Sequence, residues 1–385
     1  MGRRNTRSRS SYTCPGCRFC SQDPINQSKS PVKVLIRAAA RIDSRSEVLS
    51  DELIIRCCTD RLNRQDLSRL DVATNKGTCD TFLSLMSFDL YFCSQKNERV
   101  DFDAVWAWAN RRGNFSRTDN QLWYENPNTG VYFSLDFDPQ GSVPLDDSPI
   151  PSNYFDSGLS FNLNFNRPSF FGYEAMPYVE ELANRFDLSV IDNQAEVGLM
   201  PQPDSKVLVE SWLRHNGSAI HTVFENPPFS NPLRMPIASS LYLWKYSIVR
   251  EDLERTCGEE IFVPHLFPVH RKGTSLVGRA VTCTQGVPMI VPEADWVFVV
   301  IRKKRIFRIR EKHRIGVINI ETFRELLRDN IKTFEWTPLQ VGVIRPESCD
   351  KVGKILRSVE HILDSSELEV IRRDAFVDIQ LPDGK

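Results

Sequence analysis

Three cysteines in the stretch TCPGCRFC, residues 13–20, stand at the two-residue spacings of a metal-binding loop. Thiolates at Cys14, Cys17 and Cys20 would suit zinc or an iron–sulfur cluster, and such a site needs a fourth ligand or an open position. The next cysteine is Cys57, 37 residues beyond Cys20, and no histidine occurs in the first 214 residues. We therefore assign no metal and no other cofactor to this protein.

A second candidate metal site is the acidic stretch DFDPQGSVPLDD, which partly matches a calcium-binding loop. Asp136, Asp138 and Asp147 take the first, third and twelfth positions of such a loop. The match fails at the fifth position, where Gln140 replaces an acid, and a strand pattern rather than a helix precedes the loop. These acids more simply keep a long loop solvated, or they meet a basic partner.

The motifs of common enzymes are absent or incomplete. NPPF at residues 226–229 matches the motif with which adenine methyltransferases hold an extruded base, but no Gly-x-Gly supplies a cofactor loop. Neither H-E-x-x-H nor G-x-S-x-G occurs. Cys257, His265, His270 and Cys283 are residue types that bind zinc, yet the five-residue step between the histidines puts them on opposite faces of a strand. An enzyme on an unfamiliar template is our third hypothesis.

The strongest charge feature is RKKRIFRIREKHRIG, residues 302–316, with eight Lys or Arg and one acid. If residues 306–318 form a strand, one side of it presents cations that would bind phosphates, namely Arg308, Arg310, Lys312 and Arg314. This line has no aromatic residue to stack on bases, and residues 196–385 carry 27 Lys+Arg against 25 Asp+Glu. Nucleic-acid binding through the strand at 302–314 is therefore the alternative hypothesis.

Hydrophobic periodicity predicts the elements of a first α+β domain, residues 86–195. Phe88, Leu90 and Phe92 alternate with polar residues as a half-buried strand requires, while Val179 and Leu182 have helical spacing. The predicted order is strand, helix, hairpin, strand, helix and strand, at residues 86–94, 101–113, 121–137, 159–165, 175–186 and 188–192. This order predicts two helices on one face of a mainly antiparallel sheet.

The other face of that sheet should be polar, because Ser134 and Asp136 alternate with Phe133 and Leu135. Residues 118–166 also contain seven acids and no Lys or Arg. A solvated face is the simplest interpretation of the alternation, but it also offers a surface for a protein partner. The residues that we expect to bind such a partner are Asp136, Asp138, Asp146, Asp147, Asn162 and Asn164.

Residues 196–236 are predicted to form a proline-rich linker with a short helix at 205–214, and residues 237–385 a second α+β domain. Periodicity predicts three helices, at 238–256, 321–329 and 349–363. It predicts strands at 260–264, 275–283, 296–302, 306–318, 340–344, 368–371 and 375–379.

The first 85 residues differ in composition from the rest. They hold 15 Lys+Arg against 9 Asp+Glu and only three of the 39 aromatic residues, too few to bury much surface. This segment is expected to be disordered, or not part of the native protein if translation starts at Met86. Three alternatives are a myristoylated Gly2, a transit peptide, and a helix that begins after Ser50.

The predicted fold class is thus α+β, with two two-layer domains and mainly antiparallel sheets behind the N-terminal segment. The longest apolar runs, such as WVFVVI, are far shorter than the roughly 20 residues of a membrane span, and no secretory signal opens the chain. We expect a cytoplasmic, non-enzymatic protein that binds another protein, as an adaptor or an immunity protein does.

Overall fold

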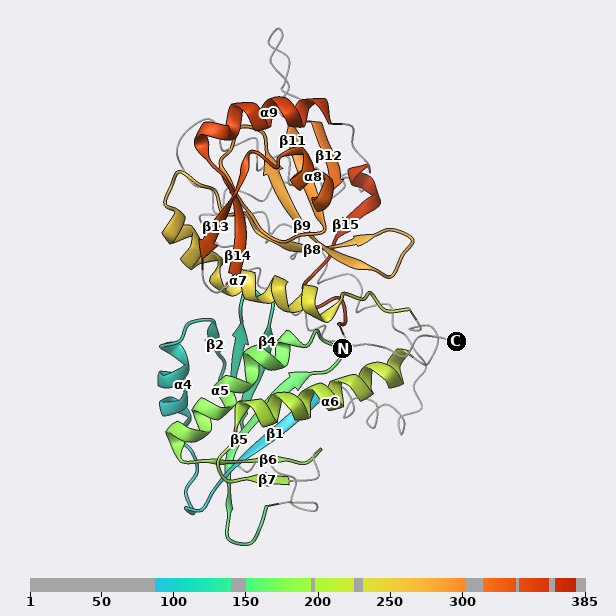
Figure 1. Cartoon of the computed structure of the whole chain (residues 1–385). Coiled ribbons are helices and arrows are strands. Elements are labelled where there is room, and N and C mark those ends of the chain that lie inside the picture. Colours follow the sequence, from blue (N-terminus) through green and yellow to red (C-terminus); the bar gives the residue numbers. More distant parts are fainter. Residues whose placement is uncertain are drawn as a thin grey trace, which may run out of the picture.

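The computed structural model describes residues 87–139, 150–194, 198–224, 231–301, 314–336, 339–359 and 364–378 (Figure 1). The predictions for the N-terminal segment, for TCPGCRFC, for Met86 and for NPPF lie outside these residues. Helices and mostly antiparallel sheets make up the described chain, so the predicted α+β class is confirmed.

A seven-stranded sheet organises the first half of the described chain. Its strands lie in the order β2-β3-β4-β5-β1-β6-β7, and every neighbouring pair is antiparallel. The sequence pattern missed β2 and β7, because three residues are too few to display a period of two. The bounds are β1 (Ser87–Ser94), β2 (Phe115–Arg117), β3 (Gln121–Glu125), β4 (Tyr132–Phe137), β5 (Phe155–Asn164), β6 (Ser189–Asp192) and β7 (Gly198–Met200).

Three helices accompany this sheet: α4 (Phe102–Asn110), α5 (Phe170–Phe186) and α6 (Ser205–Phe224). Asp101 caps α4 as predicted, since its Oδ1 accepts a hydrogen bond from Asp103 N at 2.9 Å. Helix α5 begins five residues before the predicted start, which places Pro177 inside the helix instead of in its first turn. Helix α6 is 20 residues long and continues ten residues beyond the predicted end.

The helices cover one face of the sheet and form the main core with it. Phe102 of α4 stacks on Phe137 of β4 at 4.9 Å between ring centroids, and Tyr178 of α5 lies 5.5 Å from Phe133. Phe88, Leu90 and Phe92 of β1, predicted to share one face, are all fully buried on this side. Much of the opposite face carries polar side chains, and at its β1–β6 end Cys93, Tyr154 and Ile191 form a small buried apolar cluster.

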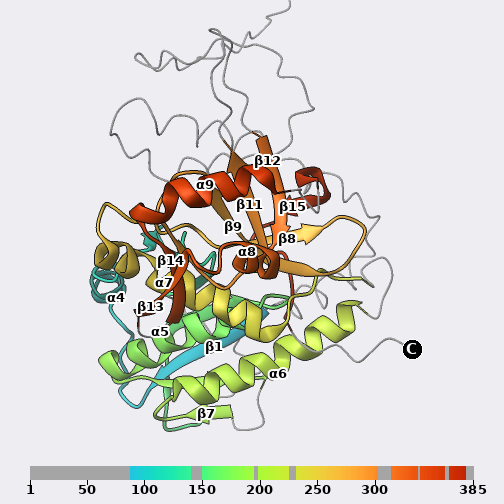
Figure 2. The same ribbon diagram turned by 45° about the horizontal axis from the view of Figure 1, so that its top comes forward.

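The second half contains a five-stranded sheet, β12-β11-β9-β8-β15, and a three-stranded sheet, β10-β14-β13. Among the described strands of these two sheets, β9 and β11 are paired in parallel and the other neighbours are antiparallel. Figure 2 shows α9 lying across the strands of this half. The bounds are α7 (Ile237–Cys257), β8 (Phe267–Arg271), β9 (Val277–Thr284), β10 (Met289–Val291), β11 (Trp296–Ile301), β12 (Arg314–Asn319), α8 (Ile320–Leu326), β13 (Ile331–Trp336), β14 (Leu339–Ile344), α9 (Cys349–Ser358) and β15 (Leu368–Val370).

Several predictions for this half need correction. The predicted strand at 260–264 is only an isolated bridge between Phe262 and Met289, and the one at 375–379 is a bridge between Val377 and Arg234. Of the strand predicted at 306–318, residues 314–319 form β12, and residues 302–313 lie outside the described chain. The pattern missed β8, β10 and β13.

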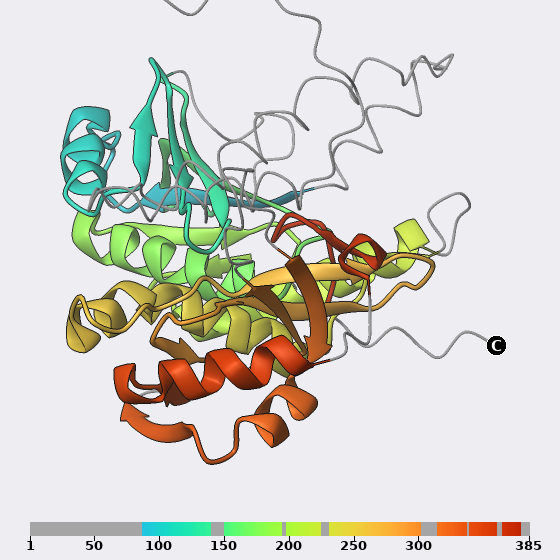
Figure 3. The same cartoon turned by 90° about the horizontal axis from the view of Figure 1, so that it is seen from above.

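Helix α7 lies between α5 and the strands of the second half (Figure 3). One continuous cluster of buried hydrophobic residues includes members from both halves, such as Phe170 and Phe376, whose ring centroids are 6.4 Å apart. The division into two domains therefore stays a prediction. Ser169, just before α5, also joins the halves, because its backbone N and its Oγ donate to Asp378 Oδ1 and Oδ2 at 2.8 and 2.6 Å.

This junction predicts a pH dependence of stability. Burial raises the pKa of Asp378 above its ordinary 3.8, although the two bonds from Ser169 act in the opposite direction. A carboxyl whose pKa is raised by folding binds its proton more tightly when folded, so the free energy of unfolding falls as pH rises from 3.8 through the raised pKa. The side chain introduced by Asp378→Asn stays neutral at every pH. We therefore expect this variant to lose the part of the fall in unfolding free energy with pH that the Asp378 carboxyl causes.

Urea unfolding of both proteins at pH values between roughly 4 and 7 measures the effect. Asparagine keeps an oxygen for Ser169 N–H, so the variant should fold. Identical pH slopes for the two proteins would contradict the prediction.

Candidate functional site: the polar sheet face

Cross-strand pairing gathers polar side chains on the face of the seven-stranded sheet that the helices leave open. Asn162 of β5 lies opposite Asp89 of β1 on one side and Ser134 of β4 on the other. Side chains that share this face alternate with the buried ones along each strand. We call this surface the polar sheet face and define it by Ser87, Asp89, Gln121, Trp123, Tyr132, Ser134, Asp136, Ser160, Asn162 and Asn164.

Asp136 is held in place by a neighbour on each of two strands. Gln121 Nε2 of β3 donates to Asp136 Oδ1 at 2.6 Å, and Ser134 Oγ of β4 donates to Oδ2 at 2.8 Å. A carboxylate oxygen can accept more than one hydrogen bond, so each Asp136 oxygen retains capacity for a ligand. The side chain is half-buried, which fixes its position without closing it off from solvent.

Asp89 repeats this arrangement on the other side of β5. Asn162 Nδ2 donates to Asp89 Oδ1 at 2.6 Å, and Ser87 Oγ donates to Oδ2 at 2.9 Å. Burial first, and then the negative charge of Asp89, raise the pKa of the nearby Tyr91. The phenol of Tyr91 therefore stays neutral, so the negative charge here comes from the carboxylates of Asp89 and Asp136. Glu125, which pairs with Tyr132 at the β3–β4 end, adds an exposed carboxylate on the same side of the sheet.

An aromatic pair lies at the β3–β4 end of the polar sheet face. Trp123 and Tyr132 stack with 5.5 Å between ring centroids and 18° between planes. The guanidinium of Arg167 lies 5.6 Å from the Tyr132 centroid, and its Nε donates to Tyr132 Oη at 2.8 Å. This end of the surface thus already binds one cationic side chain of the same protein.

The residues predicted to bind a partner are only partly brought together. Asp136, Asn162 and Asn164 lie on the polar sheet face, as their alternation predicts. Asp138 follows β4, and its backbone N donates to Gly158 O at 2.8 Å. Asp146 and Asp147 lie outside the described residues. Asp89 was not among the predicted site residues, although its alternation with Phe88 and Leu90 places it on the same surface.

The basic stripe of the nucleic-acid hypothesis is largely beyond the described chain. Arg308, Arg310 and Lys312 lie outside it, and Arg314 is placed only by its backbone, as the first residue of β12. Its pairing opposite Ile301 is the one structural fact that bears on the stripe. Nucleic-acid binding through these residues stays a hypothesis.

The four candidate zinc ligands of the second half do not lie together in the described structure. In the chain segments that the structure describes, no three His, Cys, Asp or Glu side chains gather as metal ligands, so Cys257, His265, His270 and Cys283 do not form a site. His270 Nε2 instead lies 2.6 Å from Thr274 O in an exposed hairpin. Burial raises the pKa of the Cys283 thiol to about 12, so this thiol stays protonated at neutral pH.

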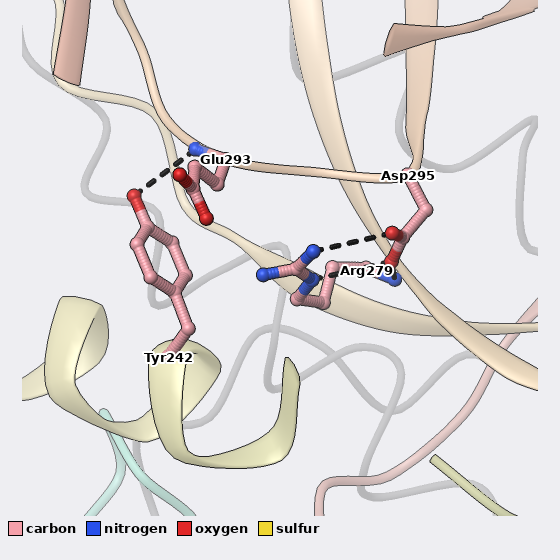
Figure 4. Close-up of polar contacts among 4 residues, drawn as sticks. All are labelled: Tyr242, Arg279, Glu293 and Asp295. Atoms are coloured by element: carbon pink, nitrogen blue, oxygen red, sulfur yellow. Dashed lines mark hydrogen bonds and ion pairs between the residues drawn. The ribbon is translucent and has the colours of Figure 1, made fainter. Parts of the chain in front are cut away.

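A polar cluster between α7 and the parallel strands β9 and β11 connects these elements (Figure 4). Arg279 of β9 donates from Nε and Nη2 to the carboxylate of Asp295, both at 3.2 Å, and its backbone N donates to Asp295 Oδ2 at 2.6 Å. Its guanidinium lies 5.3 Å from the ring centroid of Tyr242, whose hydroxyl accepts from Glu293 N at 3.0 Å. These contacts join α7 to the start of β11.

A buried carboxylate that the sequence analysis missed lies on α5. Glu174 is 8 % exposed, and its Oε1 accepts from Tyr124 Oη, Asn126 Nδ2 and Thr129 Oγ1 at 2.9, 2.8 and 3.0 Å. Its Oε2 accepts from Trp244 Nε1 of α7 at 2.7 Å. The sequence does contain a feature that marks this buried carboxylate, because Glu174 interrupts the apolar stripe of α5 four residues after Phe170. Periodicity alone identifies no partners for such a residue.

None of the helices in the described segments is both long enough and apolar enough to span a membrane.

Comparison with known proteins does not assign this chain to a family. The chain matches no protein-family model, no curated protein and no solved structure.

Proposed function

We propose that this protein binds a basic segment of another protein on the polar sheet face. The observation that supports this most directly is the pair of half-buried carboxylates, Asp89 and Asp136, each fixed by two hydrogen bonds. Carboxylates fixed in advance lose little conformational freedom when a ligand arrives. Hydrogen bonds between carboxylates and ammonium or guanidinium groups are roughly twice as strong as neutral ones.

The spacing and the surrounding charge favour an extended basic partner. Strand β5 separates the strands of Asp89 and Asp136, whose partners on β5 are two residues apart, so the two backbone positions lie about 12 Å from each other by strand geometry. Residues 86–195 carry 7 Lys+Arg against 16 Asp+Glu, which attracts cations at longer range. The stacked Trp123 and Tyr132 add ring faces on which a further guanidinium can lie.

The proposed role is non-enzymatic. A protein of the adaptor or immunity type, acting in the cytoplasm, would use such a surface to hold its partner. Phosphate groups would be repelled by the same two carboxylates, so a nucleic acid does not suit the polar sheet face.

Binding of labelled peptides tests the proposal. We expect an arginine–serine repeat peptide to bind the protein, and a glutamate–serine repeat of equal length not to bind. The double variant Asp89→Asn and Asp136→Asn should weaken binding about 5–30-fold, the effect of losing about 1–2 kcal/mol of charge-assisted hydrogen bonding. Fluorescence anisotropy at low ionic strength is the measurement.

The matched control changes the same net charge away from the polar sheet face. Glu259 and Glu260 are exposed in the second half, so Glu259→Gln with Glu260→Gln should leave the peptide affinity within about twofold. Equal weakening by both double variants would mean that net charge alone attracts the peptide, and the proposal would then fail. Tighter binding of duplex DNA than of the basic peptide would favour the nucleic-acid alternative.

A further inference from the structure

A concave site lies on the helix side of the sheet, between α5 and α7. It has a volume of about 400 Å³ and opens to solvent. Its lining comes from one side of α5, from two residues one turn apart on α7, and from Arg112, which follows α4. We call it the α5–α7 groove, and the residues that matter for its chemistry are Tyr173, Glu174, Pro177, Tyr178, Trp244 and Ile248.

Aromatic rings form the walls of the α5–α7 groove. Tyr173 and Trp244 lie 6.1 Å apart between ring centroids, with 31° between their planes, and Tyr178 contributes a third ring. Tyr173 is 37 % exposed and Ile248 is 46 % exposed, so a ligand can reach these side chains without any rearrangement of the core. The face of an aromatic ring carries partial negative charge and attracts cations.

The groove also presents hydrogen-bond acceptors. Pro177 has no backbone N–H, so the carbonyl of Tyr173, four residues earlier in α5, cannot form the usual bond of the helix. Both residues line the groove. On its floor, Glu174 Oε2 accepts one hydrogen bond, from Trp244 Nε1, whereas Oε1 accepts three. Oε2 therefore has capacity for a further donor.

The charge balance of the groove favours a cationic donor. Arg112 lines it too, but its Nε donates to Glu181 Oε2 at 2.9 Å and its guanidinium lies 4.5 Å from the Trp108 ring centroid. This pairing leaves Glu174 as the charged residue of the lining that has no ion-pair partner among the other lining residues. Arg373, which does not line the groove, offsets part of that charge from the interior, so the expected affinity for a single cation is modest.

We propose that the α5–α7 groove binds a primary ammonium group of the kind carried by a lysine side chain. The ammonium would donate to Glu174 Oε2 and to the Tyr173 carbonyl while its methylene carbons lie against the rings of Tyr173 and Trp244. This site is on the opposite side of the sheet from the polar sheet face. The inference therefore does not depend on the proposed function.

Titration with matched small probes tests the inference. Nα-acetyl-lysine methylamide and its norleucine counterpart differ only in the terminal ammonium, and the indole N–H resonance of Trp244, assigned with Trp244→Phe, reports binding. We expect the lysine probe to shift this resonance and to bind at least about fivefold more tightly than the norleucine probe. Butylammonium distinguishes a lysine side chain from a free amine as the ligand. Equal affinity for butylammonium and for the lysine probe would mean that the groove binds a free alkylamine as well as it binds a lysine side chain.

A matched pair of variants locates the site. Tyr173→Leu removes a ring from the groove and should weaken the lysine probe about 5–10-fold. Phe155→Leu removes a ring of similar exposure, 39 %, from the start of β5 and should leave the affinity unchanged. Equal affinity for the lysine and norleucine probes, no binding of either, or equal weakening by both variants would overturn the inference.

Discussion

Replacing Glu174 with leucine should lower the free energy of unfolding by about 4 kcal/mol, because four hydrogen-bond donors then lose their acceptor. Two of these donors belong to buried residues and two to half-buried ones. These donors come from β3, from the turn after it and from α7, so the loss affects the hairpin and the junction between the two halves together. Burial and the charge of Glu174 raise the pKa of Tyr124. The phenol of Tyr124 therefore stays protonated at every physiological pH. In the variant it remains a hydrogen-bond donor without its acceptor.

Guanidinium unfolding followed by far-UV circular dichroism measures this effect. The control is Glu210→Leu, which makes the same substitution at an exposed position of α6 and should change stability by no more than about 0.5 kcal/mol. If the two variants lose the same stability, the carboxylate of Glu174 does not hold the junction together.

The sequence predicted the first half of the fold well where the elements are long and amphipathic. The ten residues of β5 and the 17 of α5 each bury one side, and that alternation is visible in the order of the residues. Elements of three residues, such as β2 and β7, have too few positions for a period to appear. Their strand conformation depends on pairing with β3 and β6, which are tertiary neighbours.

The same distinction between local periodicity and tertiary contacts applies to the residues of the candidate surfaces. Asp136 and Asn162 were predicted because face membership follows from alternation along each strand. The partners of Asp89 and Glu174 come from other strands and helices, and their positions depend on register and helix packing. The two walls of the α5–α7 groove lie on helices whose facing residues are about 70 positions apart, as in the pair Glu174 and Trp244. Local periodicity contains no information about such pairs.

The contact between α5 and α6 gives a second large expected effect. A Cβ atom on Gly172 would lie 2.6 Å from Trp212 Cε3, far closer than van der Waals contact allows. Trp212 is fully buried and surrounded by core residues, so its ring cannot move aside without disturbing them. We expect Gly172→Ala to lower the free energy of unfolding by about 2–3 kcal/mol, even though alanine is the better helix former.

Gly217 of α6 is the matched control, since a Cβ atom there would meet nothing within 4 Å. Gly217→Ala should instead raise the free energy of unfolding by about 0.5–1 kcal/mol, because alanine loses less backbone entropy on forming a helix. Both changes add the same methyl group to a helix, so opposite signs in parallel urea titrations would separate packing from propensity. A stabilising Gly172→Ala would mean that α6 does not pack against α5 at this residue, and the helix layer under the sheet would then need a different arrangement.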